Sequence, residues 1–213
     1  AVEQVDARGE VIPGRQKHVK GAFGRLFLCD IATMRNVFFS LMCMVVCSAA
    51  LGQAASIQWM SLEEAVEAQK KEPRKIMMDV YTQWCGPCKM MMANTFTNAN
   101  VINYVNANYY AVKFDAESPG EVQFQGETYS NPTYDPNRRG RNGVHELSRA
   151  LGVNAYPTLV YFDEKAGVIA PISGYKQPGQ MELYLKFFHE AYQPGAGQEA
   201  WEQYRDSFEY TWR

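Results

Sequence analysis

Apolar positions along the chain alternate between short continuous runs and stripes with helical spacing. The continuous runs are rich in β-branched and aromatic residues and predict strands at residues 75–81, 109–115, 156–162 and 168–173. Helical spacing, with Ser, Asn or Pro at several starts, predicts helices that begin at Ser61, near Cys85, at Asn98, at Val144 and at Pro178. The last two strands are joined by a short turn, so we expect them to be antiparallel. The order predicts an α/β fold with a central mixed β-sheet and helices on both faces.

Two segments depart from this alternation. Residues 116–143 are rich in Pro, Gly and Asn and form an insert, with a hairpin predicted from Glu121 to Ser130. The insert carries a basic cluster that is either solvated or meets an acidic partner: Arg138, Arg139 and Arg141. Residues 193–213 contain a Pro-Gly-Ala-Gly linker at 194–197 and then a helical stripe, which indicates a helix packed back on the domain or a docking helix for a partner. The stripe consists of Trp201, Tyr204, Phe208 and Trp212.

The N-terminal part of the chain has the layout of an export signal. Met34 and Arg35 precede an apolar run of about 15 residues, and small residues follow to Ala55. The run is short for a membrane span, which needs roughly 20 apolar residues. We therefore expect a signal peptide at residues 34–55, a periplasmic or secreted protein, and contact with a membrane only through an uncleaved signal. Residues 1–33 are expected to be an upstream segment that is either disordered or not translated.

Charge and cysteine content narrow the chemistry. The formal net charge of −2 gives no reason to expect nucleic acid as a partner. Of five cysteines, Cys29, Cys43 and Cys47 lie in the part expected to be removed. The remaining chain keeps only Cys85 and Cys88, two residues apart, which excludes a disulfide-stapled scaffold and indicates either a reactive pair or a metal site.

The position of this pair favours reactivity. Cys85 stands where a buried strand gives way to a helix, and the unpaired N–H groups of a helix N-terminus favour a thiolate. Cys85 can then attack a substrate disulfide, and Cys88 can resolve the mixed disulfide. Gly86 permits the tight turn, and Pro87 lacks an N–H where a helix does not use one.

The sequence WCGPCK at residues 84–89 resembles the active-site motif of the thioredoxin family. The resemblance covers about residues 59–192, within an expected thioredoxin-like domain at 56–192, and implies a thioredoxin fold. Asp79 matches a buried Asp of the family, Lys113 the Lys near it, and Gly174 the glycine after the last strand. Tyr156 and Pro157 resemble the loop that carries the family's cis-proline. The layout is similar to exported thioredoxin-like proteins of Gram-negative bacteria, the Bacteroidetes especially.

The resemblance implies roles for these residues. A buried Asp79 resists ionisation and can accept and return the proton of Cys88; the alternative is a structural Asp paired with Lys113. Trp84 is expected to shield the disulfide, and the backbone before Pro157 to pair with an extended substrate segment. The expected substrate-binding residues are Trp84, Gly86, Pro87, Tyr156 and Pro157.

Four functions remain open from the sequence. The Gly-Pro dipeptide favours a disulfide reductase of the cell envelope, which would act on disulfide-containing proteins and take electrons from a membrane donor. An oxidase or isomerase of oxidative folding is the alternative, since the insert can shift the potential. A third is a non-catalytic binding or chaperone module. A fourth is a zinc site from Cys85, Cys88, His145 and His189, whose spacing fits no compact finger. We expect no cofactor other than the Cys85–Cys88 disulfide.

Overall fold

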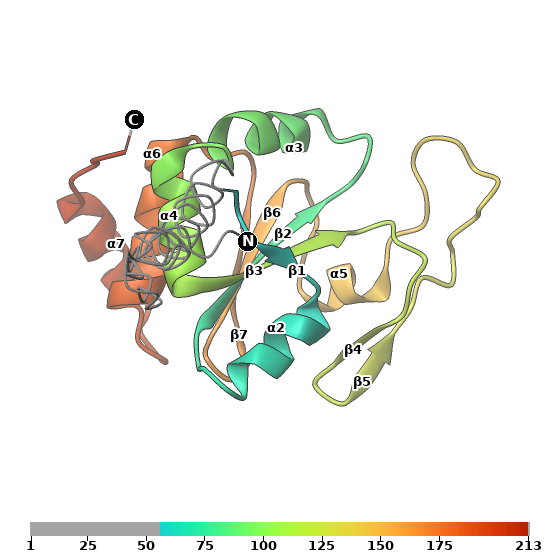
Figure 1. Cartoon of the computed structure of the whole chain (residues 1–213), viewed down its shortest axis with the longest axis horizontal. Coiled ribbons are helices and arrows are strands. Elements are labelled where there is room, and N and C mark those ends of the chain that lie inside the picture. The colour runs from blue at the N-terminus through green and yellow to red at the C-terminus, as the bar shows by residue number, and fades with distance from the viewer. Residues whose placement is uncertain (1–55, 213) are drawn as a thin grey trace, which may run out of the picture. The chain divides into compact units, whose positions relative to one another are not determined.

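The computed structural model describes residues 56–212, and its centre is a five-stranded mixed sheet in the order β1-β3-β2-β6-β7 (Figure 1). β1 and β3 run parallel, as do β3 and β2. β6 runs antiparallel to β2, and β7 runs antiparallel to β6. The predicted α/β thioredoxin fold is therefore confirmed. The strands of this sheet are β1 (Trp59–Met60), β2 (Lys75–Tyr81), β3 (Tyr109–Asp115), β6 (Thr158–Phe162) and β7 (Val168–Ser173).

Alternation along the central strands gives the sheet two buried faces. Ile76, Met78 and Val80 of β2 lie in one hydrophobic cluster with the helices α2 (Leu62–Gln69) and α5 (Glu146–Ala150). Met77 lies in the opposite cluster. That face is covered by α3 (Gly86–Met90), η2 (Met91–Thr95), α4 (Ala99–Asn108), α6 (Pro178–Lys186) and η3 (Phe187–Ala191). Strands buried on both faces read as continuous apolar runs, which is why β2 and β3 were predicted with their observed bounds.

Several predicted bounds need correction. The two-residue strand β1 was not predicted. β6 begins at Thr158 rather than Tyr156, because Pro157 has no N–H to donate to the sheet. α5 starts at Glu146 rather than Val144, since His145 serves as its N-cap and accepts the Leu147 N–H on Nδ1. The helix predicted to run on to about Phe96 changes to π-helical geometry at Met91. No helix of residues 56–212 is long and apolar enough to cross a membrane.

The Ser-x-x-Glu spacing at the start of α2 forms a complete capping box. The backbone N–H of Glu64 donates to Ser61 Oγ at 3.1 Å, and the Ser61 N–H donates to Glu64 Oε2 at 2.8 Å. Both bonds satisfy donors that have no partner within the helix.

Replacement of Ser61 by Ala is expected to lower the free energy of unfolding by about 1 kcal/mol, because one N–H at the start of α2 loses its acceptor. Urea denaturation measures this loss. Ser61→Thr keeps the acceptor and is the matched control, expected to stay close to the unsubstituted protein. Equal losses for Ala and Thr would assign the effect to packing instead of to the cap.

The insert contains the predicted hairpin, formed by β4 (Val122–Phe124) and β5 (Glu127–Tyr129). Gln125 and Gly126 make its turn with positive φ values of 54° and 84°. Val122 and Phe124 are buried against the sheet in the cluster of α2. The loop after β5 extends beyond the end of the sheet where β2 and β3 finish (Figure 1).

The C-terminal stripe is helical only in its first half. Helix α7 (Gln198–Ser207) ends before Phe208, and the chain then runs on without helical structure. The buried carboxylate of Glu182 explains the change, because it accepts the backbone N–H groups of Thr211 and Trp212, both at 2.8 Å. The segment packs back on the domain: the Trp201 ring stacks on Tyr184 with centroids 5.1 Å apart.

Candidate functional site

Cys85 and Cys88 form a disulfide at the start of α3, with an S–S distance of 2.05 Å. Cys85 is the N-cap residue, and its Sγ accepts the backbone N–H of Cys88 at 3.1 Å. α3 continues into η2, so the sulfur lies at the N-terminus of a helical stretch from Gly86 to Thr95. A donated N–H and the positive end of a helix both stabilise a thiolate at Cys85 once the pair is reduced. Gly86 and Pro87 lie exposed beside the disulfide.

Trp84 connects the disulfide loop to two other parts of the chain. Its Nε1–H donates to Glu117 Oε1 at 2.9 Å, just after the end of β3. Its ring meets the Tyr156 ring edge to face, with centroids 5.9 Å apart. The side chain remains 37% exposed and therefore presents apolar surface next to Cys85.

The loop before β6 is held by backbone bonds to the strand beside it. The Tyr156–Pro157 peptide bond is cis, and the Pro157 carbonyl accepts the Gly174 N–H at 2.7 Å. Gly174 has a φ of 92°, a conformation that glycine adopts without a side-chain clash. Through the Tyr156–Trp84 contact this loop stands against the segment that carries Cys85.

Asp79 and Lys113 form an ion pair because their strands place them opposite each other. They are Cα partners in the parallel β2–β3 register, and Lys113 Nζ lies 3.2 Å from Asp79 Oδ2. The Asp79 side chain is 1% exposed, and its Oδ1 has no hydrogen-bond partner among residues 56–212. Burial raises the pKa of Asp79 above its ordinary value, although the charge and hydrogen bond of Lys113 act in the opposite direction.

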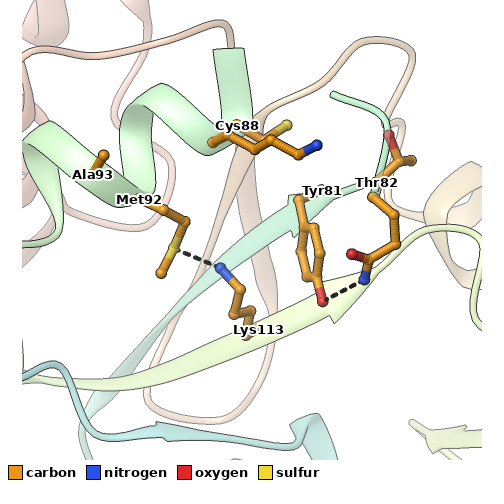
Figure 2. Close-up of a pocket in the computed structure, with 8 residues that line it drawn as sticks. Tyr81, Thr82, Cys88, Met92, Ala93 and Lys113 are labelled. Carbon is orange, nitrogen blue, oxygen red and sulfur yellow. Dashed lines mark hydrogen bonds between the residues drawn. The ribbon is translucent and has the colours of Figure 1, made fainter. Parts of the chain in front are cut away.

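A cavity of about 500 Å³ opens beside Cys88 (Figure 2). Lys113 enters it from β3, and its Nζ lies 2.6 Å from Met92 Sδ on the helical stretch. The Lys113 ammonium also lies 4.5 Å from the centroid of the Tyr81 ring. Cys88 and Lys113 line this cavity together, so the second cysteine of the pair and the partner of Asp79 share one solvent-accessible space.

The structure places the predicted site residues in two groups. Trp84, Gly86, Pro87 and Tyr156 surround the exposed side of the disulfide loop, whereas Asp79 and Lys113 lie beneath it on the sheet. The histidines proposed as zinc ligands are engaged elsewhere. His145 caps α5 and its Nε2 bonds the Gly120 carbonyl at 2.8 Å; His189 packs against Tyr104 and Tyr109. Within residues 56–212 no group of three or more His, Cys, Asp or Glu side chains is arranged to hold a metal ion.

Two residues at the site were not assigned to it from the sequence. Glu117 could have been found, because it follows β3 and the ends of the parallel strands β2 and β3 lie at one edge of the sheet. The position of Arg141 at the site could not have been found from the sequence. Its guanidinium carbon lies 4.2 Å from the centroid of the Trp84 ring, and this contact is made by an irregular loop far from Trp84 in sequence.

Protein-family models identify the family to which this chain belongs. The family model described as a thioredoxin-like domain matches residues 62–189, which is more than half of the chain. The chain belongs to the thioredoxin-like family. Together with the Cys85–Cys88 disulfide, this makes it a thioredoxin-like redox domain with a CxxC pair.

Individual relatives of this thioredoxin-like chain are distant. It is 24% identical over 123 residues to the thiol:disulfide interchange protein DsbD of Pectobacterium atrosepticum, covering 57% of this chain and only 18% of DsbD. It is 29% identical over 85 residues to thioredoxin-1 of Saccharomyces cerevisiae, covering 39% of this chain and 73% of that protein. A thioredoxin-fold protein from Helicobacter pylori superposes with a TM-score of 0.50 at 14% identity, covering 73% of this chain and 91% of that one. These relatives support the fold and do not assign a bacterial group.

Proposed function

We propose that this protein reduces disulfides of substrate proteins by dithiol–disulfide exchange at Cys85 and Cys88. The observation that carries the proposal is the placement of Cys85 Sγ at the N-cap of α3, where it accepts the Cys88 N–H at 3.1 Å. The names of the relatives, a thiol:disulfide interchange protein and a thioredoxin, support the same chemistry.

The exchange has two steps. The thiolate of reduced Cys85 attacks one sulfur of the substrate disulfide, and the other sulfur leaves as a thiolate that takes up a proton. Cys88 then gives up its proton and attacks Cys85 Sγ. The Cys85–Cys88 disulfide forms, and the second substrate thiolate is released and protonated. Two electrons pass to the substrate. We assign Asp79 as the group that accepts the Cys88 proton, directly or through water; its ion-pair partner Lys113 lines the cavity that Cys88 also lines.

Substrate contacts are proposed on the exposed side of the loop. Trp84 and Tyr156 present apolar surface, and Gly86 and Pro87 are exposed next to Cys85. The backbone at Tyr156 and Pro157 would pair with an extended substrate segment by strand addition. Lys113 stays in place as the counter-charge of Asp79.

Regeneration of the dithiol requires an electron donor. We propose export of the protein to the periplasm or exterior, where a membrane dithiol protein would supply two electrons. The support is the signal-like sequence from Met34 to Ala55, which lies outside the described residues, as does the segment 1–33. The intact mass of the native protein tests this: cleavage after about Ala55 supports export, and retention of the whole segment argues for an anchor.

The reduction potential of the Cys85–Cys88 pair is expected to be near that of thioredoxin, about −270 mV, because the dipeptide between the cysteines is Gly-Pro. The measurement equilibrates the full chain, with Cys29, Cys43 and Cys47 replaced by Ser, against dithiothreitol buffers. Each 30 mV is a tenfold change in equilibrium for this couple. A value above about −180 mV would contradict a reductase and would make oxidative folding the working function.

A further inference from the structure

Two side chains of the insert, Arg141 and Glu117, contact Trp84 in the disulfide loop. The Arg141 guanidinium lies over the face of the Trp84 ring at 4.2 Å, while Glu117 holds the indole N–H at 2.9 Å. Trp84 immediately precedes Cys85. The exposed Arg141 side chain is thus fixed beside the approach to the nucleophile.

The loop that carries Arg141 is built by specific hydrogen bonds. Asn131 Nδ2 donates to the carbonyls of Ser118 at 3.1 Å and Gly143 at 2.7 Å, which closes the base of the loop. Next to Arg141, the Asn142 side chain accepts the Asp135 N–H at 2.8 Å and donates to the Asp135 carbonyl at 2.9 Å. These bonds set where Arg141 points.

A guanidinium stacked on an aromatic face keeps its N–H groups at the rim of the plane, where they match a carboxylate. Arg141 forms no ion pair with any residue from 56 to 212, and the same holds for its neighbours Arg138 and Arg139. The carboxylates at this edge already have partners: Glu117 accepts from Trp84, and Asp115 accepts from Gln83 at 2.9 Å. The site therefore has an oriented, unpaired cation next to Cys85.

We propose that Arg141 binds a carboxylate of the substrate, so that the protein prefers disulfides whose cysteine is flanked by Asp or Glu. This inference rests on the proposed disulfide exchange and adds the class of substrate. Arg141 would contact the substrate while its stacking on Trp84 keeps the guanidinium in place. Arg138 and Arg139 would strengthen the attraction without a directed contact.

The test compares three disulfide-cyclised peptides that differ only in the residue flanking one cysteine: Glu, Gln or Lys. The reduced full chain is expected to react about threefold to fivefold faster with the Glu peptide than with the Lys peptide at low ionic strength, the range of an exposed ion pair. The ratio should shrink in 0.5 M salt, where the screening length falls to a few ångströms. Stopped-flow fluorescence gives the second-order rate constants.

Four variants make the test specific. Arg141→Gln is expected to bring the Glu-to-Lys ratio close to one, and Arg141→Lys to give an intermediate ratio, because the charge stays but the planar fork is lost. Gly143→Ala keeps every charge but puts a Cβ 2.5 Å from the backbone carbonyl of Thr133, so it should also lower the ratio by displacing the loop. Lys165→Gln removes one exposed charge from the turn after β6, at the opposite end of the sheet from Cys85, and should leave the ratio unchanged.

The outcomes separate this inference from the function on which it rests. Reduction of all three peptides without a charge preference would overturn the role of Arg141 and leave disulfide exchange intact. An equal fall of all three rates in Arg141→Gln, with the ratio preserved, would also overturn it, since Arg141 would then act only through Trp84. Failure of the reduced protein to react with any peptide would overturn both.

Discussion

A variant with Cys88 replaced by Ser is expected to become trapped as a mixed disulfide between Cys85 and its substrate, with turnover reduced by more than about 10³-fold. The first step of exchange needs only Cys85, whereas release of the substrate needs the second sulfur. Non-reducing electrophoresis and intact mass measure the trapped species directly. The full chain with Cys29, Cys43 and Cys47 replaced by Ser is the background, so that the only remaining thiol is Cys85.

The matched control is Cys85→Ser, which keeps Cys88 as the only thiol. Solvent exposure does not distinguish the two sulfurs, since Cys85 is 2% and Cys88 4% exposed in the disulfide form. Hydrogen bonding distinguishes the two sulfurs. Cys85 Sγ accepts the Cys88 N–H at the start of the helical stretch, whereas no backbone N–H within residues 56–212 donates to Cys88 Sγ. Cys85→Ser is therefore expected to trap little substrate. Trapping by Cys85→Ser but not by Cys88→Ser would reverse the two roles.

The parts of the fold that the sequence predicted are those governed by local pattern. β2, β3 and β7 were placed with their observed bounds, and the hairpin turn at Gln125 and Gly126 followed from its composition. β1 has only two residues and cannot show alternation; it exists because Trp59 pairs with Ala111 on the outer edge of β3. No pattern marks the change to π-helical geometry at Met91.

The site shows the same division between local pattern and tertiary contact. The Asp79–Lys113 pair followed from the resemblance to the thioredoxin family, and the structure explains it by the parallel register of β2 and β3. The disulfide followed from two cysteines on one helical turn. The Arg141–Trp84 contact depends on the path of an irregular loop, which is set by side-chain bonds from Asn131 and Asn142. The end of α7 depends in the same way on Glu182. Its carboxylate accepts the backbone N–H groups of Thr211 and Trp212, so these residues do not continue the helix. Contacts of this kind have no periodicity along the chain.

Replacement of Asp79 by Asn is expected to raise the free energy of unfolding at pH 7 by about 1–3 kcal/mol, because Asn has no charge that burial would strip of water. The carboxylate is 1% exposed, and Oδ1 has no partner within the described residues. Lys113 loses its counter-charge in this variant, but its side chain is 23% exposed and can be hydrated. Urea denaturation of the oxidised protein measures the gain.

The sign of the pH dependence follows from the raised pKa of Asp79. Between about pH 3.9, where an unfolded Asp titrates, and the higher pKa of the folded state, the folded protein holds a proton that the unfolded chain has lost. Stability contributed by this group therefore falls as the pH rises through that window, and the loss is complete above the folded pKa. Asp79→Asn has no such proton and should lack this slope. Asp206→Asn, at an exposed position on α7, is the matched control and should change stability by less than about 0.5 kcal/mol.

The same substitution is expected to slow the second step of exchange by about a hundredfold or more, because Cys88 loses its proton acceptor. Release of the substrate from the mixed disulfide, followed after rapid mixing, isolates this step from the attack by Cys85. If the Asp79→Asn variant is both more stable and slower, the unsubstituted protein keeps its buried carboxylate for proton transfer, at a cost in stability. A variant that is less stable, with the rate of release unchanged, would instead make the Asp79–Lys113 pair a structural ion pair, and the acceptor for the Cys88 proton would then have to be water in the adjoining cavity.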